Sequence, residues 1–323
     1  MKKKVAIILV VAIIVVSCVA LAMCQQKPED KKFVVGICQL APHAALDQAT
    51  QGFIDALKEE LGEENVEIDL QNAAGDTNQC STIIGNFVSK NVDLIMANAT
   101  PALQAAYNAT TTIPILGTSI TEYGVALGTT VTGGIVGGNV SGTSDLAPLD
   151  KQAEMIFEFC PDVKTVGIIY CSSEANSKFQ VDEMKKHLQA KNVTVKEYSF
   201  TESNEISAIV ELACSECEAL YIPTDNTAAS CAETIGNIVR EKKIPVFTGE
   251  ENPAKACGVA SLTISYYDLG VATGKMAAQI LKGKANISTM EIQYAQPTKK
   301  VNKEMCELLG LEIPDGYVEM DLE

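Results

Sequence analysis

The apolar stretch Phe33-Val34-Val35-Gly36-Ile37 has a counterpart later in the chain, Thr165-Val166-Gly167-Ile168-Ile169, and this repetition predicts the fold. Each stretch is followed by an Ile-Pro segment, Ile113-Pro114-Ile115-Leu116-Gly117 in the first case and Ile244-Pro245-Val246-Phe247 in the second. The glycine of each stretch precedes the proline of its Ile-Pro segment by the same number of residues. Because a long internal repeat indicates a duplicated structural unit, we expect two similar lobes.

Strand-like and helix-like segments alternate within each half. In the first half, buried strands are expected at 33–37, 66–70 and 92–97, with amphipathic helices at 46–61 and 78–89 between them. The second half repeats this order. Such alternation is typical of a parallel sheet that is covered on both faces. The predicted fold class is α/β, with two doubly wound parallel-sheet lobes joined by a multi-segment hinge.

Later segments are expected to return the chain from one lobe to the other. A helix at 268–282 would lead back to the first lobe, and the residues after it would cross again. Several short crossings form a hinge that can absorb changes in backbone angles. The predicted division is 33–145 with about 268–290 for lobe 1, and 146–267 with about 291–323 for lobe 2.

The beginning of the chain has the pattern of a bacterial export signal. A basic start precedes an apolar run from Val5 to Val16, which is shorter than the roughly 20 residues of a membrane span. Val15-Val16-Ser17-Cys18 then resembles a lipobox, with Leu21-Ala22-Met23-Cys24 as an alternative. We expect a signal peptide at 1–17, lipidation of Cys18, a tether at 18–32 and an extracytoplasmic, lipid-anchored protein. An uncleaved anchor helix is the competing interpretation.

Charge and composition exclude several classes of partner. The formal net charge of −16 does not suit nucleic acid or an anionic membrane surface, so contact with the membrane is expected through the lipid anchor only. The sequence has 11 cysteines, and most of those beyond the lipobox candidates Cys18 and Cys24 lie in apolar surroundings, which is typical of small core residues. Cys214-Ser215-Glu216-Cys217 is a lone CxxC in a chain with 2 histidines, so no metal site is expected.

Enzyme signatures are missing from the sequence. It contains no GxSxG, no P-loop and no HExxH, and the glycine-rich segment 133–138 lacks the Lys-Ser/Thr pair of a phosphate loop. That segment predicts a turn leading to the first crossing, and 227–241 predicts a single helix. We expect a binding protein without a cofactor, acting as a monomer.

Polar loops follow the predicted strands of both halves. In parallel sheets, ligands bind beyond the carboxyl ends of strands, where helix N-termini favour carboxylates. The candidate ligand-binding residues in these loops are Gln39, His43, Leu46, Asn98, Thr100, Thr118, Ser172, Ser173, Asn176, Ser177, Thr224, Asp225, Glu250 and Tyr266.

Three of these candidates have a specific predicted role. Asp225 could hold an ammonium group by charge-assisted hydrogen bonds, or it could only cap the helix that follows. Glu250 is a second candidate for the ammonium. Tyr266 could cover an apolar ligand, or it could lie at the edge of the core. Together these residues predict a cleft that closes on a small zwitterionic ligand.

The chain resembles the ABC-transporter substrate-binding lipoproteins of the tryptophan/tyrosine-binding type over nearly all of its length after the tether. The resemblance rests on Phe53-Ile54-Asp55-Ala56-Leu57-Lys58, Asp69-Leu70-Gln71-Asn72-Ala73-Ala74-Gly75-Asp76, Val92-Asp93-Leu94-Ile95, Ala99-Thr100-Pro101, Ser172-Ser173-Glu174-Ala175-Asn176-Ser177, Ile222-Pro223-Thr224-Asp225-Asn226-Thr227 and Tyr266-Tyr267-Asp268-Leu269-Gly270. It implies a type I periplasmic-binding-protein-like fold with three hinge crossings, and delivery of an aromatic amino acid to an ABC permease and its ATPase.

The resemblance also implies that Ser173, Asn176 and Asp225 lie near the backbone of the ligand. Two departures bear on the ligand rather than the fold. The family often has His-Pro-Ala-Leu-Asp where this chain has His43-Ala44-Ala45-Leu46-Asp47, and Thr-Asp-Pro where it has Thr121-Glu122-Tyr123. A sensor that passes a ligand signal to a membrane receptor remains an alternative. A sugar-binding protein of the same fold is another, but the chain has no tryptophan and a single arginine, Arg240, with which to hold a sugar.

Overall fold

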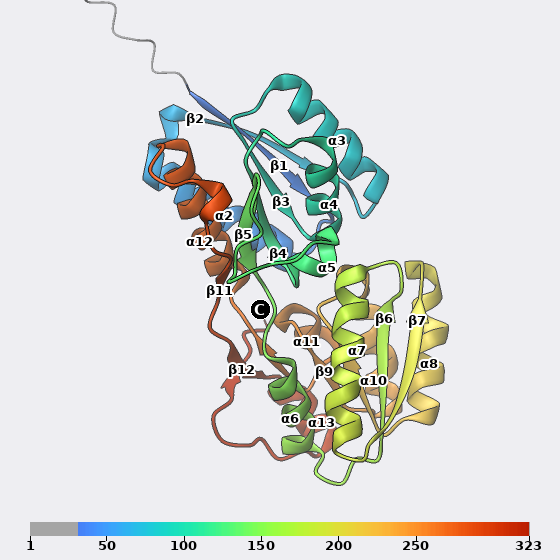
Figure 1. The fold of residues 1–323 in the computed structure, drawn as a ribbon. Helices are drawn as coiled ribbons and strands as arrows, with labels where there is room; N and C mark the ends of the chain where they lie inside the picture. The colour runs from blue at the N-terminus through green and yellow to red at the C-terminus, as the bar shows by residue number, and fades with distance from the viewer. Residues whose placement is uncertain (1–31, 323) are drawn as a thin grey trace, which may run out of the picture.

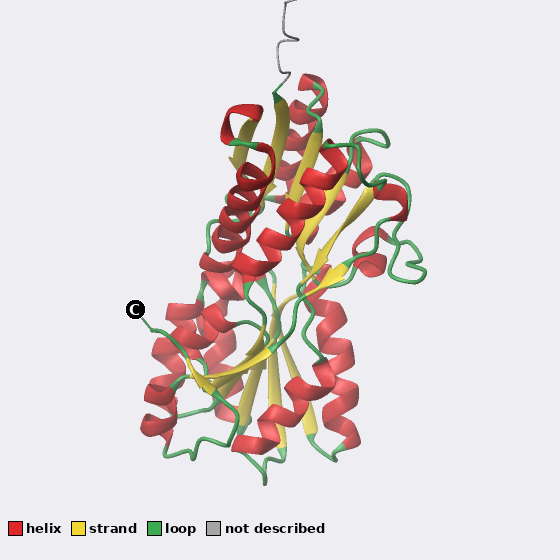
Figure 2. Cartoon of the chain, turned by 90° about the vertical axis from the view of Figure 1, so that its left-hand side faces the viewer, coloured by secondary structure: helices red, strands yellow, loops and turns green. Residues whose placement is uncertain are grey.

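The computed structural model describes residues 32–322, which form two lobes stacked along the long axis of the molecule (Figure 1). The predicted signal peptide, Cys18 and all but the last residue of the tether lie outside the described residues. No helix within 32–322 combines the length and the apolar character that a membrane crossing requires. Each lobe is a sheet with helices on both faces, as the alternation of strand and helix patterns predicted (Figure 2).

Lobe 1 contains a six-stranded sheet in the order β11-β5-β4-β3-β1-β2, with every pairing parallel. Its strands are β1 (Phe33–Gln39), β2 (Val66–Asn72), β3 (Leu94–Asn98), β4 (Ile115–Ile120), β5 (Val140–Ser144) and β11 (Gln293–Tyr294). Its helices are α2 (Ala44–Leu61), α3 (Thr77–Lys90), α4 (Thr100–Ala109), α5 (Tyr123–Leu127) and α12 (Tyr266–Leu281), with short 3-10 turns at Glu63–Asn65 and Ile287–Thr289.

Lobe 2 contains a seven-stranded sheet in the order β13-β12-β10-β9-β8-β6-β7, parallel except for the antiparallel pair β10–β12. Its strands are β6 (Thr165–Cys171), β7 (Thr194–Phe200), β8 (Ala219–Ile222), β9 (Val246–Thr248), β10 (Ala260–Thr263), β12 (Thr298–Val301) and β13 (Val318–Glu319). Its helices are α6 (Leu149–Phe159), α7 (Ala175–Ala190), α8 (Ile206–Glu216), α9 (Asn226–Ser230), α10 (Ala232–Lys242), α11 (Glu251–Cys257) and α13 (Lys303–Leu309), with a 3-10 turn at Ser203–Glu205.

The central strands are buried on both faces. β3, β4 and β8 are buried at every position, and each sheet has one apolar cluster on either side. Because the strands of lobe 1 and strands β6 to β10 of lobe 2 run parallel within their sheets, their carboxyl ends lie at the edge that faces the other lobe. The polar loops that follow these strands therefore meet between the lobes.

The chain crosses between the lobes three times. The crossings lie between β5 and α6, between β10 and α12, and between β11 and β12. The last crossing comes later than we predicted, because Gln293 and Tyr294 pair with Thr143 and Ser144 of β5 and so belong to the first sheet, not to the second lobe.

Two segments differ from the sequence-based prediction. The single helix expected at 227–241 is two helices, α9 and α10, which are separated at Cys231. The glycine-rich segment does not lead directly to the first crossing. Gly133, Gly134, Gly137 and Gly138 all have positive φ angles, and the chain then adds β5 to the sheet before it leaves the lobe.

Helix α12 packs on α2 at very short range. A Cβ atom at Gly270 would lie 2.0 Å from the carbonyl oxygen of Ala49, and one at Gly52 would lie 2.1 Å from that of Tyr267. Only glycine permits this approach. The contact fixes α12, and with it Tyr266 at its first turn, to lobe 1.

Candidate functional site

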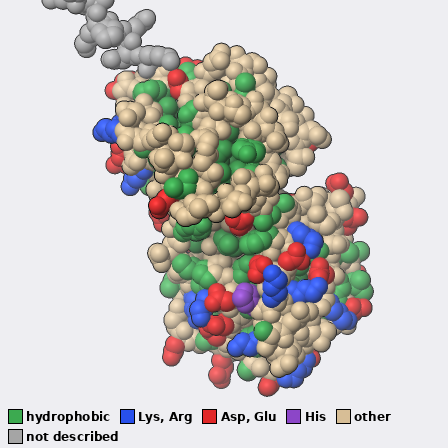
Figure 3. Space-filling view, in the orientation of Figure 1, with side chains coloured by type: hydrophobic (Ala, Val, Ile, Leu, Met, Phe, Trp, Pro, Cys, Tyr) green, Lys and Arg blue, Asp and Glu red, His purple; other side chains and the backbone are tan. Residues whose placement is uncertain are grey.

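A narrow cavity with almost no free volume lies between the lobes, at the edge where the strand ends of both sheets meet. Figure 3 shows hydrophobic side chains gathered at the waist of the molecule, with charged side chains more frequent over the lower lobe. The cavity interior is polar by contrast. It is lined by His43, Leu46, Ser119 and Thr121 of lobe 1, Asp145 and Tyr266 at the crossings, and Asn176, Thr224, Asn226 and Glu250 of lobe 2.

Two carboxylates, those of Asp145 and Glu250, line the cavity together with Tyr266. The Tyr266 hydroxyl donates to Asp145 Oδ2 at 3.0 Å, and both residues are close enough to Glu250 to influence its pKa. Both carboxylates are almost completely excluded from solvent, with relative exposures of 3% and 2%. None of the residues lining the cavity is a lysine or an arginine, so no cationic side chain compensates these two acids.

Burial disturbs the ionisation of these groups. It raises the pKa of Glu250 to about 8, and the neighbouring carboxylates of Asp145, Asp225 and Glu174 add to this rise. It also raises the pKa of Asp145 to about 6, against the hydrogen bonds from Tyr266 and Thr121 that favour the ionised form. The closed site therefore resists holding two unpaired negative charges.

Unpartnered polar atoms converge on the cavity from both lobes. Of the buried side-chain atoms without a hydrogen-bond partner, five belong to its lining: His43 Nδ1, Ser119 Oγ, Asp145 Oδ1, Asn176 Oδ1 and Glu250 Oε1. Orphaned buried polar groups are rare because each costs about 1–3 kcal/mol. Their concentration at one place indicates a site built for a polar ligand.

Backbone strain occurs at the same edge. Ala99, after β3, has a φ angle of 87°, and Ser119, in β4, has a φ angle of 56°. Non-glycine residues with positive φ are uncommon and cluster at functional sites. Ala99 precedes α4, and His43 precedes α2, and neither side chain caps its helix.

A direct contact joins the lobes beside the cavity. His43 Nε2 lies 3.3 Å from Asn226 Oδ1, and burial lowers the pKa of this histidine, so it is neutral at pH 7. Glu174 organises the lobe 2 side, since its carboxylate accepts hydrogen bonds from the backbone and side chains of both Asn226 and Thr227.

Six of the predicted candidates line the cavity, and the others lie behind or beside it. His43, Leu46, Asn176, Thr224, Glu250 and Tyr266 line the cavity. Gln39 and Asn98 lie behind it and fix the start of α2: Gln39 Nε2 donates to Asp47 Oδ1 at 2.6 Å, and Asn98 Nδ2 donates to the carbonyl oxygen of Leu46 at 2.8 Å.

The remaining hydroxyl candidates are not in the cavity lining. Thr100 is buried in the first turn of α4, and Thr118 Oγ1 lies 3.2 Å from Thr143 Oγ1 inside lobe 1. Ser172 Oγ donates to the carbonyl oxygen of Phe200 at 3.1 Å. Ser173 lines a neighbouring groove between the lobes, and Ser177 is fully buried beside Asn176.

Asp225 is occupied by the backbone of its own lobe. Its Oδ1 accepts from the N–H of Ala228 at 2.8 Å, which caps α9, and its Oδ2 accepts from the N–H of Cys171 at 2.6 Å. It is absent from the cavity lining. The structure therefore favours the capping interpretation over the ammonium contact, and Glu250 is left as the candidate for the ammonium.

We expect Asp225→Ala to lower the free energy of unfolding by about 1–3 kcal/mol, because it removes a helix cap and leaves the buried N–H of Cys171 without an acceptor. Urea unfolding measures the change. Asp182→Ala, on the exposed face of α7, is the control and should change stability by less than about 0.5 kcal/mol. Equal effects of the two substitutions would contradict the capping role.

Ser119, Thr121, Asp145 and Asn226 line the cavity but were not among the predicted candidates. Ser119 follows the predicted candidate Thr118, and Thr121 and Asn226 lie in stretches that were compared with the family. Asp145 has a weaker signal: it is a lone acidic residue at the first crossing, and its importance depends on Tyr266 at the second crossing.

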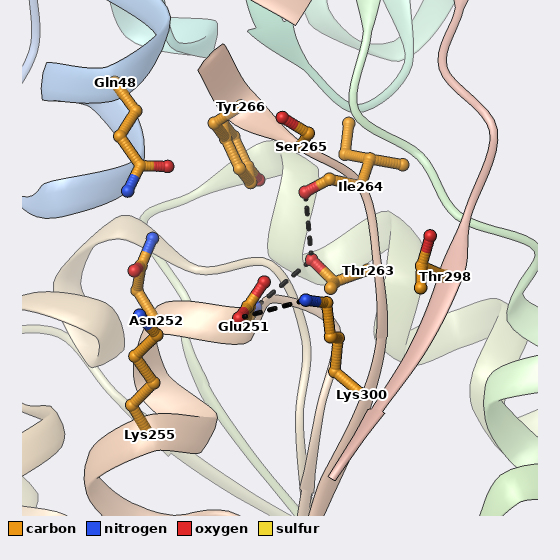
Figure 4. Close-up of a pocket in the computed structure, with 10 residues that line it drawn as sticks. All are labelled: Gln48, Glu251, Asn252, Lys255, Thr263, Ile264, Ser265, Tyr266, Thr298 and Lys300. Carbon is orange, nitrogen blue, oxygen red and sulfur yellow. Dashed lines mark hydrogen bonds and ion pairs between the residues drawn. The ribbon is translucent and has the colours of Figure 1, made fainter. Parts of the chain in front are cut away.

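Two further depressions adjoin the cavity. Figure 4 shows a pocket on the hinge side that shares Tyr266 with the cavity and holds two lysines, Lys255 and Lys300. Lys300 Nζ lies 3.8 Å from Glu251. On the other side, a groove shares Asn226 with the cavity and is bordered by the apolar residues Leu40, Ala41, Pro42 and Pro101. Within residues 32–322, no group of three or more His, Cys, Asp or Glu side chains is placed to hold a metal ion.

Comparison with known proteins identifies a family. The sequence matches the family model described as ABC transporter substrate binding protein over residues 34–320. It is 38% identical over 259 residues to a tyrosine-binding protein of Clostridioides difficile, a match covering 78% of this chain and 73% of the relative.

Two solved structures are similar over nearly their whole length. The ABC domain from Streptococcus pneumoniae in complex with L-Trp has a TM-score of 0.84 and 34% identity, covering 88% of this chain and 97% of that one. The ligand-free, open structure of a substrate-binding protein with adhesive properties from Clostridium difficile has a TM-score of 0.69 and 38% identity, covering 90% and 100%. The lobes of this chain are therefore arranged more like those of the L-Trp complex than like those of the open structure.

Proposed function

We propose that this chain, which belongs to the family of ABC transporter substrate-binding proteins, binds an aromatic amino acid between its lobes and delivers it to a membrane permease. The observation that carries the proposal is the convergence of unpartnered buried atoms from both lobes on one cavity. The named ligands of its relatives, tyrosine and L-Trp, support an aromatic side chain.

The site offers a separate environment for each part of such a ligand. Glu250 Oε1, Asp145 Oδ1 and Asn176 Oδ1 are acceptors for an ammonium group. The Ser119 hydroxyl and the uncapped start of α2 are donors for a carboxylate. The apolar border of the adjoining groove suits an aromatic ring.

A binding screen tests this function. Each amino acid, and a set of sugars and short peptides, is added to the purified protein while thermal unfolding is followed. A ligand present at 100 times its Kd should add about 2.7 kcal/mol to the free energy of unfolding. We expect this for tyrosine, tryptophan or phenylalanine. Stabilisation by a sugar or a peptide, with none by any amino acid, would refute the proposal.

Delivery to a permease requires the protein to stay at the outer face of the membrane, and we propose that a lipid on Cys18 holds it there. Cys18→Ala should release the protein from membranes or leave its signal uncleaved, which fractionation and immunoblotting will detect. Mass spectrometry of the processed N-terminus distinguishes Cys18 from Cys24, and an unmodified N-terminus beginning at Met1 would argue for an uncleaved anchor.

Lowering the pH from 8 to 6.5 should favour the closed arrangement of the ligand-free protein. In this arrangement the pKa of Glu250 is raised to about 8. We expect opening of the lobes to expose the carboxylate to water and return its pKa towards the ordinary value of roughly 4.3. Between these values the closed form binds a proton that the open form does not. The closed form is therefore favoured over the open form at low pH. Its free-energy advantage falls by up to roughly 1.4 kcal/mol per pH unit as the pH rises, and it is lost once the pH has passed about 8.

Small-angle scattering measures this change as a smaller radius of gyration at pH 6.5 than at pH 8. Glu250→Gln removes the titrating group and should leave the radius nearly independent of pH in this range. Below pH 6.5 the lowered pKa of His43 acts in the opposite direction, because its buried ring must then be protonated on opening. The same pH response in Glu250→Gln would contradict the assignment.

A further inference from the structure

The cavity is lined by acidic side chains but by no lysine or arginine. Its two carboxylates, Asp145 and Glu250, are buried and have no basic partner among the residues that line it. Two lysines, Lys255 and Lys300, line the hinge-side pocket that shares Tyr266 with the cavity, but they are not part of the cavity lining. His43, the one imidazole of the cavity, is kept neutral by burial. Any positive charge that balances the two acids must therefore come from the ligand.

Among the buried polar atoms of the cavity that lack a hydrogen-bond partner, acceptors also predominate. Asp145 Oδ1 and Glu250 Oε1 accept hydrogen bonds but cannot donate when ionised, and Asn176 Oδ1 is also an acceptor. The possible donors are the neutral hydroxyl of Ser119 and backbone N–H groups at the starts of α2, α7 and α11, where no side chain caps the helix. An ammonium therefore meets two acids that ionise when a cation pairs with them, whereas a carboxylate meets neutral dipoles alone.

The surroundings make a buried carboxylate still less favourable. Glu174 and Asp225 lie just behind the lobe 2 wall and contribute to the electrostatic environment of Glu250. Removing a charged group from water costs several kcal/mol unless an opposite charge is close to it. An incoming carboxylate would find four acidic side chains near it and no cationic side chain in the cavity.

Resting on the proposed function, we infer that the site recognises its ligand through the ammonium group and does not require the carboxylate, so that arylethylamines belong to its ligand class. The corresponding aryl-propionic acids, which keep the ring and the carboxylate but lack the nitrogen, are excluded. This selection follows from Asp145, Glu250 and Asn176 acting together on one charged nitrogen.

Isothermal titration of the purified protein at pH 7 with matched ligands tests the inference. One series is L-tyrosine, tyramine and 3-(4-hydroxyphenyl)propionate, and the other is L-tryptophan, tryptamine and indole-3-propionate. In at least one series we expect the amine to bind at least a hundredfold more tightly than the acid. A ratio below a hundred in both series, including the case in which neither compound binds, overturns the inference.

Variants connect the selectivity to the residues. The double substitution Asp145→Asn with Glu250→Gln keeps the shapes but removes both charges, so it should reduce the amine-to-acid ratio at least tenfold. Asp182→Asn, on the exposed face of α7, should leave the ratio unchanged. An unchanged ratio in the double variant, with circular dichroism showing that it is folded, also overturns the inference.

These outcomes separate the inference from the proposed function. If the amines bind but neither tyrosine nor tryptophan does, the amino-acid assignment fails and the recognition of ammonium stands. If the amino acids bind while the amines bind no better than the acids, the assignment stands and the inference fails.

Discussion

Replacing Glu250 by glutamine is expected to weaken binding of the aromatic amino acid by about 2–5 kcal/mol, or roughly thirtyfold to several thousandfold in Kd. Glutamine preserves the size of the side chain but removes the charge that would face the ammonium group. Because the carboxylate is excluded from solvent in the closed site, water cannot replace the lost interaction. Calorimetry with the wild type and the variant at pH 7 measures the loss.

Asp225→Asn is the matched control for this substitution. Asp225 is equally buried and lies in the same lobe, but both of its oxygens already accept hydrogen bonds from backbone N–H groups. Its neutralisation should affect stability more than affinity. If Asp225→Asn lost affinity while Glu250→Gln stayed within threefold of the wild type, the ammonium contact would belong to Asp225 after all.

The arrangement of the lobes follows from features that are local in the sequence. Apolar runs predicted the strands and 3.6-residue periodicity predicted the helices between them, and the repeat predicted the second lobe. β5 was missed because Val140-Ser141-Gly142-Thr143-Ser144 has no apolar run. Its residues are nevertheless all buried, since the polar ones pair inside the lobe, as Thr143 does with Thr273 of α12 at 2.9 Å.

The sequence predicted where the site lies, but not which side chains line the cavity. Strand ends in a parallel sheet must meet at one edge, so the loops could be named from the sequence. Which side chains in a loop reach the cavity depends on hydrogen bonds made elsewhere. The Asp225 carboxylate accepts a hydrogen bond from the backbone N–H of Cys171, on the neighbouring strand, and so stays within lobe 2. The Asp145 carboxylate instead accepts a hydrogen bond at the cavity from Tyr266, which lies 121 positions away. No local pattern encodes such pairs.

Helix α12, which begins at Tyr266, packs closely on α2, so a substitution at this contact should have a large effect on stability. Gly270→Ala should lower the free energy of unfolding by about 1–3 kcal/mol or more. The new Cβ would lie 2.0 Å from the carbonyl oxygen of Ala49 and 2.9 Å from the nitrogen of Phe53. Both are backbone atoms of a helix, so relief requires the two helices to move apart. Urea unfolding provides the measurement.

Gly85→Ala makes the same chemical change in the exposed interior of α3, where a Cβ would meet nothing within 4 Å. There the gain in helix propensity acts alone, and the protein should become more stable by roughly 0.5–1 kcal/mol. The two substitutions are therefore expected to have opposite signs. Gly270→Ala should also weaken ligand binding, because any displacement of α12 moves Tyr266 away from Asp145 and Glu250. A stable Gly270→Ala variant with unchanged affinity would show that the close helix contact does not position the site.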